Sequence, residues 1–254
     1  MRFINFVILY TFIICNPSYA SNEVSLSKEG LKTCITSNGT PNHEIGKFPN
    51  KGNPHSFKAQ KLKYCFPTNP IKNTFVNNKA KTVGITLTGI PIRPGTADWY
   101  DASSPRKHSR DKSSGWNLEA ITPNGYVFGI DQNNAHVDNK GLYHYHGMPD
   151  KLHNFDGNSL VGYAADGYEI QVSKDSKYQS SYQLKSGKRL MGPRGRFDGS
   201  YTEDFEYISG SGDLDECNGL LTDDKQYSYI LTHEFPFVPR CWRGEPDESF
   251  LRLR

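Results

Sequence analysis

Short stretches in which apolar and polar residues alternate recur along most of the chain, separated by glycine, proline and asparagine. Alternation with a period of two is typical of half-buried β-strands, and helical spacing is found at most over a turn within 203–209 or near Asp215. The clearest hairpin turns at Asp166-Gly167, a dipeptide that type I′ turns prefer. We therefore predict a mostly β protein, a single compact β-sandwich or barrel-like domain with long loops and little helix. The predicted strands cover residues 83–88 with a continuation over 89–92, a pair within 120–130 around a turn at 123–125, the two arms of 160–172, and 227–235.

The first twenty residues have the pattern of a secretory signal peptide. A positive start at Arg2 precedes an apolar run over 3–14, and Ser18-Tyr19-Ala20 is a small-x-small cleavage site. The apolar run is about twelve residues long, whereas a membrane-spanning helix needs roughly twenty. We therefore expect a secreted or periplasmic protein with no stable membrane insertion once the signal peptide, residues 1–20, is removed.

Composition and charge narrow the classes of partner. The 254-residue chain carries 30 Lys and Arg against 27 Asp and Glu, a net charge of +3, which is too balanced to favour nucleic acid. Aromatic residues make up 13% of the chain, and their flat rings suit a pleated sheet. Residues 21–80 are the more polar part, so we expect a loop-rich amino-terminal segment with two or three edge strands. The main domain is expected over 81–254.

Removal of the signal peptide also removes Cys15, which leaves Cys34, Cys65, Cys217 and Cys241. An even number of cysteines in an exported chain indicates disulfides, and no two of these have the CxxC spacing of a zinc site. Three pairings are compatible with four cysteines. Loop closure favours the local one, Cys34–Cys65 with Cys217–Cys241.

Three of the eight histidines, His136, His144 and His146, fall within eleven residues. His144 and His146 alternate with Tyr143 and Tyr145, so in a strand both imidazoles point to one face. Two imidazoles on one face are close enough to share a metal ion. The same pattern is also compatible with a hydrogen-bonded core strand in which the histidines are structural.

The position of His136 depends on the turn between the two strands. A two-residue loop would place His136 opposite Tyr143, on the wrong face. A three-residue loop over 139–141 would place it opposite His144, and Gly141 then occupies the position that needs a left-handed backbone. We favour the three-residue loop and a shared face of three histidines.

The chain lacks the common catalytic motifs. No GxSxG nucleophile elbow, HExxH helix, Walker A loop or GxGxxG loop is present. The aromatic residues Trp99, Tyr100 and Trp116 are compatible with a surface on which a sugar stacks, although such side chains are more often packed.

At these residues the chain resembles the YHYH-domain proteins, whose namesake motif is Tyr143-His144-Tyr145-His146. The resemblance extends from Val83 to Gly244, with matching stretches at 89–92, 160–168, 214–219 and 235–244, and it does not cover residues 21–80. It implies an exported domain and indicates where the site lies, without implying a particular reaction.

We therefore consider two functions of different classes. In the first, His136, His144 and His146 bind Zn or Cu as cofactor, and the domain is a metal-binding protein or a metal-dependent hydrolase. Asp131 and Asp166 are the candidate catalytic carboxylates for that chemistry. In the second, the protein is a non-catalytic module that binds an extracellular or cell-wall glycan or a protein, and its histidines are structural.

Overall fold

A computed structural model of the chain describes residues 21–78, 81–123, 125–149, 160–172, 177–222 and 226–251. The predicted signal peptide, residues 1–20, lies outside this range and stays a prediction. In the part of the chain that is described, no helix has the length and apolar character needed to cross a bilayer.

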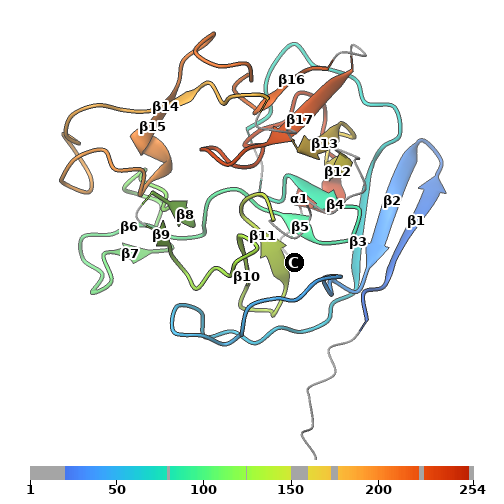
Figure 1. Cartoon of the computed structure of the whole chain (residues 1–254), viewed down its shortest axis with the longest axis horizontal. Helices are drawn as coiled ribbons and strands as arrows, with labels where there is room; N and C mark the ends of the chain where they lie inside the picture. Colours follow the sequence, from blue (N-terminus) through green and yellow to red (C-terminus); the bar gives the residue numbers. More distant parts are fainter. Residues whose placement is uncertain are drawn as a thin grey trace, which may run out of the picture.

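Eight strands form the central sheet, and the histidine-bearing hairpin lies at one edge of it (Figure 1). The sheet is open, because its order begins at β10 and ends at β16, so the described strands form no closed barrel. In spatial order the strands are β10 (Ala135–Val137), β11 (Tyr143–Tyr145), β5 (Pro91–Ile92), β4 (Gly84–Thr86), β12 (Leu160–Ala164), β13 (Glu169–Val172), β17 (Tyr227–Leu231) and β16 (Gly219–Leu221).

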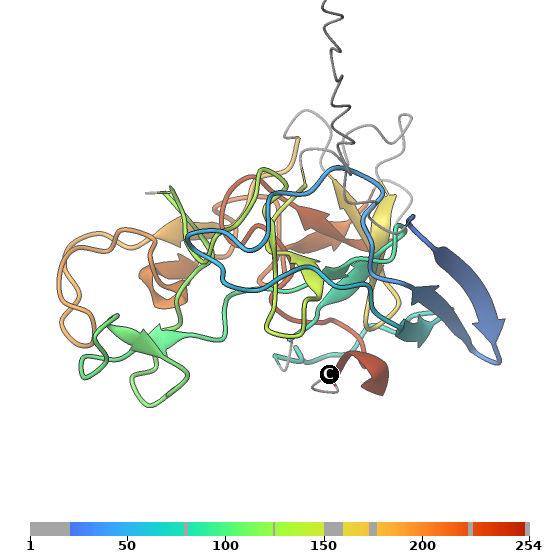
Figure 2. The ribbon, with the colours of Figure 1, turned by 90° about the horizontal axis from the view of Figure 1, so that it is seen from below.

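A separate antiparallel sheet of three strands comes from the amino-terminal part of the chain: β1 (Val24–Glu29), β2 (Lys32–Ser37) and β3 (Leu62–Pro67). The β1–β2 hairpin projects from the body of the molecule, and all six residues of β1 are exposed (Figures 1 and 2). Ile35 and Tyr64 of this sheet belong to the same buried cluster as Ile85 and Ile170 of the central sheet. The amino-terminal sheet is therefore packed on the main core.

Three two-stranded ribbons lie together on the side of the molecule away from β1 and β2 (Figures 1 and 2). They are β6 (Trp99–Tyr100) with β7 (His108–Ser109), β8 (Ile121–Thr122) with β9 (Gly125–Tyr126), and β14 (Tyr182–Leu184) with β15 (Phe205–Tyr207). Helical structure is limited to a 3-10 turn, Thr202–Asp204, and one short helix, α1 (Glu248–Leu251), among the described residues. The prediction of a mostly β, sandwich-like fold with little helix is confirmed, although α1 was not expected.

Both cysteine pairs favoured by loop closure are confirmed. The sulfurs of Cys34 and Cys65 are 2.12 Å apart and join β2 to β3. The sulfurs of Cys217 and Cys241 are 2.03 Å apart and tie the chain before β16 to the carboxyl-terminal segment.

Two turns differ from the sequence prediction. Residues 89–92 do not continue the strand that precedes them: the chain reverses at Gly89, with φ of 78°, and β5 pairs antiparallel to β4. The turn at Asp166-Gly167 is not type I′, because only Gly167 has a positive φ and its N–H donates to Ala164 O. The longer turn leaves the Asp166 side chain buried, where it makes the contacts described below.

Candidate metal centre

The β10–β11 hairpin has the register that the three-residue loop predicts. His136 pairs with His144, and Val137 pairs with Tyr143. Asp138 and Leu142 close the loop with a backbone hydrogen bond of 3.0 Å, and Gly141 has a φ of 84°. The Asp138 carboxylate also accepts the backbone N–H groups of Lys140 and Leu142. The turn is therefore fixed by one side chain and one left-handed glycine.

This register brings three imidazoles into contact through their Nε2 atoms. His146 Nε2 lies 3.2 Å from His136 Nε2 and 3.1 Å from His144 Nε2. His144 is 4% exposed and His146 5% exposed, while His136 is half-buried and forms the side of the cluster nearest to solvent. Among the described residues these three are grouped closely enough to hold a metal ion. The other such group, Glu29 with Cys34 and Cys65, has both sulfurs in a disulfide.

Backbone carbonyls orient two of the rings. His136 Nδ1 lies 2.9 Å from Phe128 O, and His144 Nδ1 lies 3.1 Å from Leu142 O. Only a protonated Nδ1 can donate to a carbonyl, so these contacts assign the lone pair of each ring to Nε2. Phe128 has a φ of 59°, an uncommon conformation for a side chain of this size. His146 Nδ1 is buried and makes no hydrogen bond of normal geometry with the described residues.

The cluster is neutral in the metal-free protein at neutral pH. Burial lowers the pKa of His136 and lowers that of His144 and His146 far below the ordinary histidine value. A neutral His146 has at most one proton on Nε2, although that atom contacts two other Nε2 atoms. His146 Nε2 can therefore donate one linear hydrogen bond at most, so at least one of the two contacts has no such bond, an arrangement that a cation bound to all three nitrogens relieves.

The spacing fits an ion of the size of zinc. Two nitrogens bound tetrahedrally at about 2.0–2.1 Å from one ion lie about 3.3 Å apart. The two measured Nε2–Nε2 distances, 3.1 and 3.2 Å, are close to this value. The three Nε2 atoms are thus spaced closely enough to bind one transition-metal ion together.

Asp131 lies near the hairpin but is committed to other contacts. One carboxylate oxygen accepts Tyr143 OH and Gly46 N, each at 2.8 Å. The other accepts the N–H groups of Asn133 and Ala135. Tyr143 points to the face of β11 opposite the histidines, so this buried carboxylate fixes the strand from behind.

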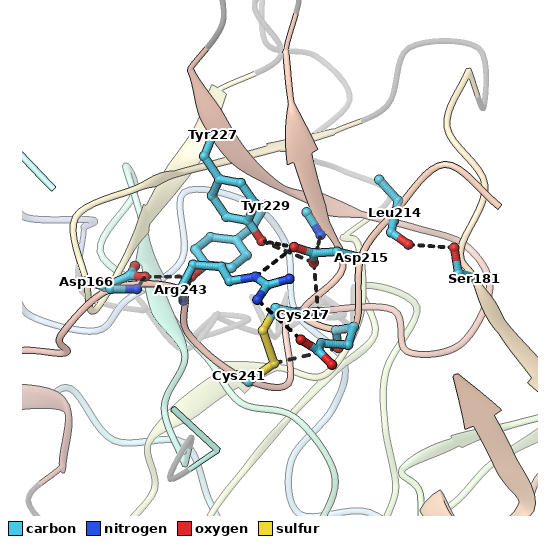
Figure 3. A network of polar contacts seen from close by, with 12 residues as sticks. Asp166, Ser181, Leu214, Asp215, Cys217, Tyr227, Tyr229, Cys241 and Arg243 are labelled. Carbon is cyan, nitrogen blue, oxygen red and sulfur yellow. Dashed lines mark hydrogen bonds and ion pairs between the residues drawn. A yellow bond between two sulfur atoms is a disulfide. The ribbon is translucent and has the colours of Figure 1, made fainter. Parts of the chain in front are cut away.

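Asp166 lies elsewhere in the sheet, in the turn after β12, with β5 and β4 between that strand and β11. It accepts Tyr229 OH at 2.6 Å and Gly244 N at 2.9 Å, and burial raises the pKa of its carboxyl group. Figure 3 shows it beside Tyr229 and Arg243, within a network that includes Asp215 and the Cys217–Cys241 disulfide. The structure does not bring Asp131 or Asp166 into the three-histidine group.

The aromatic residues considered for sugar stacking are half-buried, two of them in β6 and Trp116 in the loop between β7 and β8. Trp116 packs edge-on to Tyr201, with ring centroids 5.9 Å apart, and the Arg189 guanidinium lies 5.9 Å from the Trp116 ring. Trp99 and Tyr100 form β6. Trp116 is therefore engaged in packing within the protein.

Sequence reasoning missed the groups that orient the cluster. Phe128 acts through its backbone carbonyl, which has no signature in the sequence. Arg93 forms a 2.9 Å ion pair with Asp138, next to the loop that sets the histidine register. The sequence shows Arg93 directly after the apolar residues 89–92. Because these residues were predicted to continue the preceding strand, the position of Arg93 beside the histidine hairpin could not be predicted.

The comparison with known proteins agrees with the motif. A family model described as YHYH protein matches residues 63–244. The match begins twenty residues before Val83, so the expectation that residues 21–80 lie outside the resemblance is wrong for 63–80, which include β3 from its second residue on. No curated protein and no solved structure matches the chain. The matched range contains all three histidines, both strands of their hairpin and the Cys217–Cys241 pair, and the chain belongs to the YHYH protein family.

Proposed function

We propose that this protein binds one transition-metal ion, zinc or copper, through the Nε2 atoms of His136, His144 and His146. The observation that carries the proposal is the convergence of three Nε2 atoms, two of them assigned a lone pair by carbonyl contacts at Nδ1. Histidine ligands in metalloproteins commonly donate their other ring N–H in this way, which fixes the tautomer and strengthens the donor. Imidazole suits both Zn(II) and Cu(II), so the metal's identity is left to measurement.

The proposed setting is an exported one. The Cys34–Cys65 and Cys217–Cys241 disulfides fit an oxidising compartment, where such bonds persist. The signal-like residues 1–20 support the same conclusion from the sequence.

We further propose that the bound ion takes part in catalysis. Three protein nitrogens leave a zinc ion with an open position, at which a bound water can become a nucleophile. Asp131 and Asp166 stay predictions as catalytic residues. The contacts of Asp131 with Tyr143 and Gly46 favour a positioning role, and Asp166 lies on another part of the sheet.

Calorimetric titration of metal-stripped mature protein with Zn(II) and with Cu(II) tests the proposal. We expect one site that binds at least one of the ions more tightly than about 100 μM, a free energy beyond about −5.5 kcal/mol. His144→Gln and His146→Gln should each weaken binding at least about tenfold, since each removes a ligand. His55→Gln is the matched control, because His55 lies outside the cluster. If wild type binds neither ion, the histidines are structural and the glycan- or protein-binding alternative becomes the better account.

A further inference from the structure

Arg93 lies on the same face of the sheet as the histidines. The parallel pairing of β11 with β5 places Tyr145 beside Ile92, and Arg93 N donates to Tyr145 O at 2.9 Å. Paired residues in adjacent strands share a face, so Ile92 lies on the tyrosine face. Arg93, the next residue, is therefore on the face of His144 and His146.

The Arg93 side chain crosses β11 on that face. Its Nη1 donates to Asp138 Oδ2 at 2.9 Å, and Asp138 lies just beyond β10. In the sheet order, β5 and β10 lie on opposite sides of β11, so the side chain passes over the strand that carries His144. After burial, the positive charge of Arg93 is the largest cause that lowers the pKa of His144, and it acts on the other two rings as well.

Part of the Arg93 guanidinium makes no hydrogen bond with the described residues. Arg93 Nε donates to Thr82 Oγ1 at 3.3 Å and Nη1 to Asp138, while Nη2 makes no hydrogen bond with the described residues. The side chain is 22% exposed and His136 is half-buried, so both are partly accessible to a solute. A guanidinium offers two parallel N–H groups that match the oxygens of a carboxylate or phosphate.

The charges at the site favour an anion. A divalent ion on three neutral imidazoles adds two positive charges beside Arg93. The carboxylates of Asp138, paired with Arg93, and of Asp131, behind the strand, supply two negative charges, so the balance stays positive. No carboxylate of the described residues joins the three-histidine group to balance the ion. Like charges that are partly buried repel one another unless an anion lies between them.

We propose that the metal centre takes a small oxyanion as its exogenous ligand, held by the metal ion and by the free N–H groups of Arg93. This inference rests on the proposed metal site and names the class of ligand or substrate that the site accepts. The shared chemistry is a carboxylate or phosphoryl oxygen, and inorganic phosphate and acetate represent the two sources.

The test uses mature protein loaded with Co(II), whose visible spectrum reports on its ligands, in a buffer that does not coordinate metal. Phosphate or acetate is titrated into wild type, Arg93→Gln and Arg110→Gln. The last variant makes the same change of charge at an exposed arginine. We expect a saturable spectral change with at least one anion for wild type and Arg110→Gln, and an apparent affinity weakened about tenfold or more for Arg93→Gln.

The double variant Arg93→Gln/Asp138→Asn controls for the unpaired carboxylate that the single variant leaves, and it should show the same loss of anion binding. If Co(II) binds but neither anion changes the wild-type spectrum, or if both Arg93 variants bind the anion as wild type does, the inference is wrong while the metal site stands. If Co(II), Zn(II) and Cu(II) all fail to bind wild type, the proposed metal site itself fails.

Discussion

His136 and His144 each face a backbone carbonyl with Nδ1 and the third histidine with Nε2. The carbonyl contacts leave the Nε2 lone pairs directed at a common point before any ion binds. Burial keeps the rings neutral, and neutral imidazole is the form that binds metal. The cluster thus has both the ligand nitrogens and the neutral protonation state that metal binding needs.

The lowered histidine pKa values predict how the metal-free protein responds to acid. In the unfolded chain these histidines take up protons below about pH 6.5, whereas in the folded protein they resist protonation to lower pH. The unfolded state then binds more protons, so stability that is full above about pH 6.5 is lost as the pH falls. Urea unfolding at pH 7.5 and pH 5.5 measures this. The His144→Gln/His146→Gln variant should lose less stability between the two values, and an equal loss in both proteins contradicts the assignment.

A substitution at Asp166 separates a structural role from a role at the metal. Asp166→Ala removes a buried acceptor of Tyr229 OH and Gly244 N, and we expect it to lower the free energy of unfolding by about 2–4 kcal/mol. Metal affinity should stay within about threefold of wild type, because a group outside the ligand set is changed. Urea unfolding and calorimetry provide the two readouts. Unchanged stability together with lost metal binding would place Asp166 at the site instead.

The sequence predicted the residues of the cluster well because a strand imposes a period of two. That period alone places His144 and His146 on one face and the two tyrosines on the other. The carbonyl of Phe128 could not be predicted, because it depends on the backbone conformation of a residue outside the hairpin. The partners of Asp131 and Asp166 were also hidden, since they come from distant parts of the chain.

At the scale of elements, the turn of the β10–β11 hairpin decides whether three histidines share a face. Gly141 has a φ of 84°, and a Cβ there would lie 2.8 Å from Ser56 O. Both the backbone conformation and the close approach of residue 56 therefore require glycine. A shift of one residue in this turn would move His136 to the opposite face.

Gly141→Ala should lower both stability and metal affinity. Gly115→Ala is the matched control, because Gly115 has a φ of 71° but open space around its Cβ position. We expect Gly115→Ala to cost about 1 kcal/mol from backbone strain alone, and Gly141→Ala about 1–3 kcal/mol more. Thermal unfolding and calorimetry measure the two effects. Equal losses of stability in the two variants, with metal affinity unchanged, would show that this turn does not set the site.

Two other turns show the limit of local patterns. The sequence around Gly89 alternates like a continuous strand, yet the chain reverses there, and a Cβ at Gly89 would collide with the Ser37 side chain. The reversal is supported by a contact with β2, which lies about fifty residues earlier. The Asp166-Gly167 dipeptide predicted the place of a turn correctly, but the burial of the Asp166 side chain selects a longer turn than its composition suggests.

At the scale of the whole molecule, the two disulfides differ in what they connect: one joins two strands that already pair in a sheet, and the other joins the chain before β16 to the carboxyl-terminal segment. Cys34–Cys65 closes the sheet of β2 and β3, and Cys217–Cys241 holds the carboxyl-terminal segment, whose Arg243 contacts Asp215. The metal hairpin lies at the β10 edge of the central sheet, and β16 forms the other edge. We therefore expect loss of the Cys217–Cys241 disulfide to lower the free energy of unfolding while changing metal affinity little.

The bridges and the predicted start of the mature chain are tested together. We expect exported protein to begin at Ser21 and to contain no free thiol. Loops of 31 and 24 residues predict that loss of either bridge lowers the free energy of unfolding by about 3–4 kcal/mol. Intact mass, a non-reducing peptide map and unfolding of the Cys217→Ala/Cys241→Ala variant provide the measurements. Free thiols at all four positions would contradict both the pairing and the oxidising compartment.

The central claim is that three histidines of one hairpin hold a metal ion. Elemental analysis of protein purified from its native compartment, without added metal or chelator, tests it most directly. We predict about one zinc or copper ion per chain in wild type and a strongly reduced content in the His144→Gln/His146→Gln variant purified alongside it. Wild-type protein that carries neither ion above the buffer background, or a variant that carries as much metal as wild type, would contradict the claim.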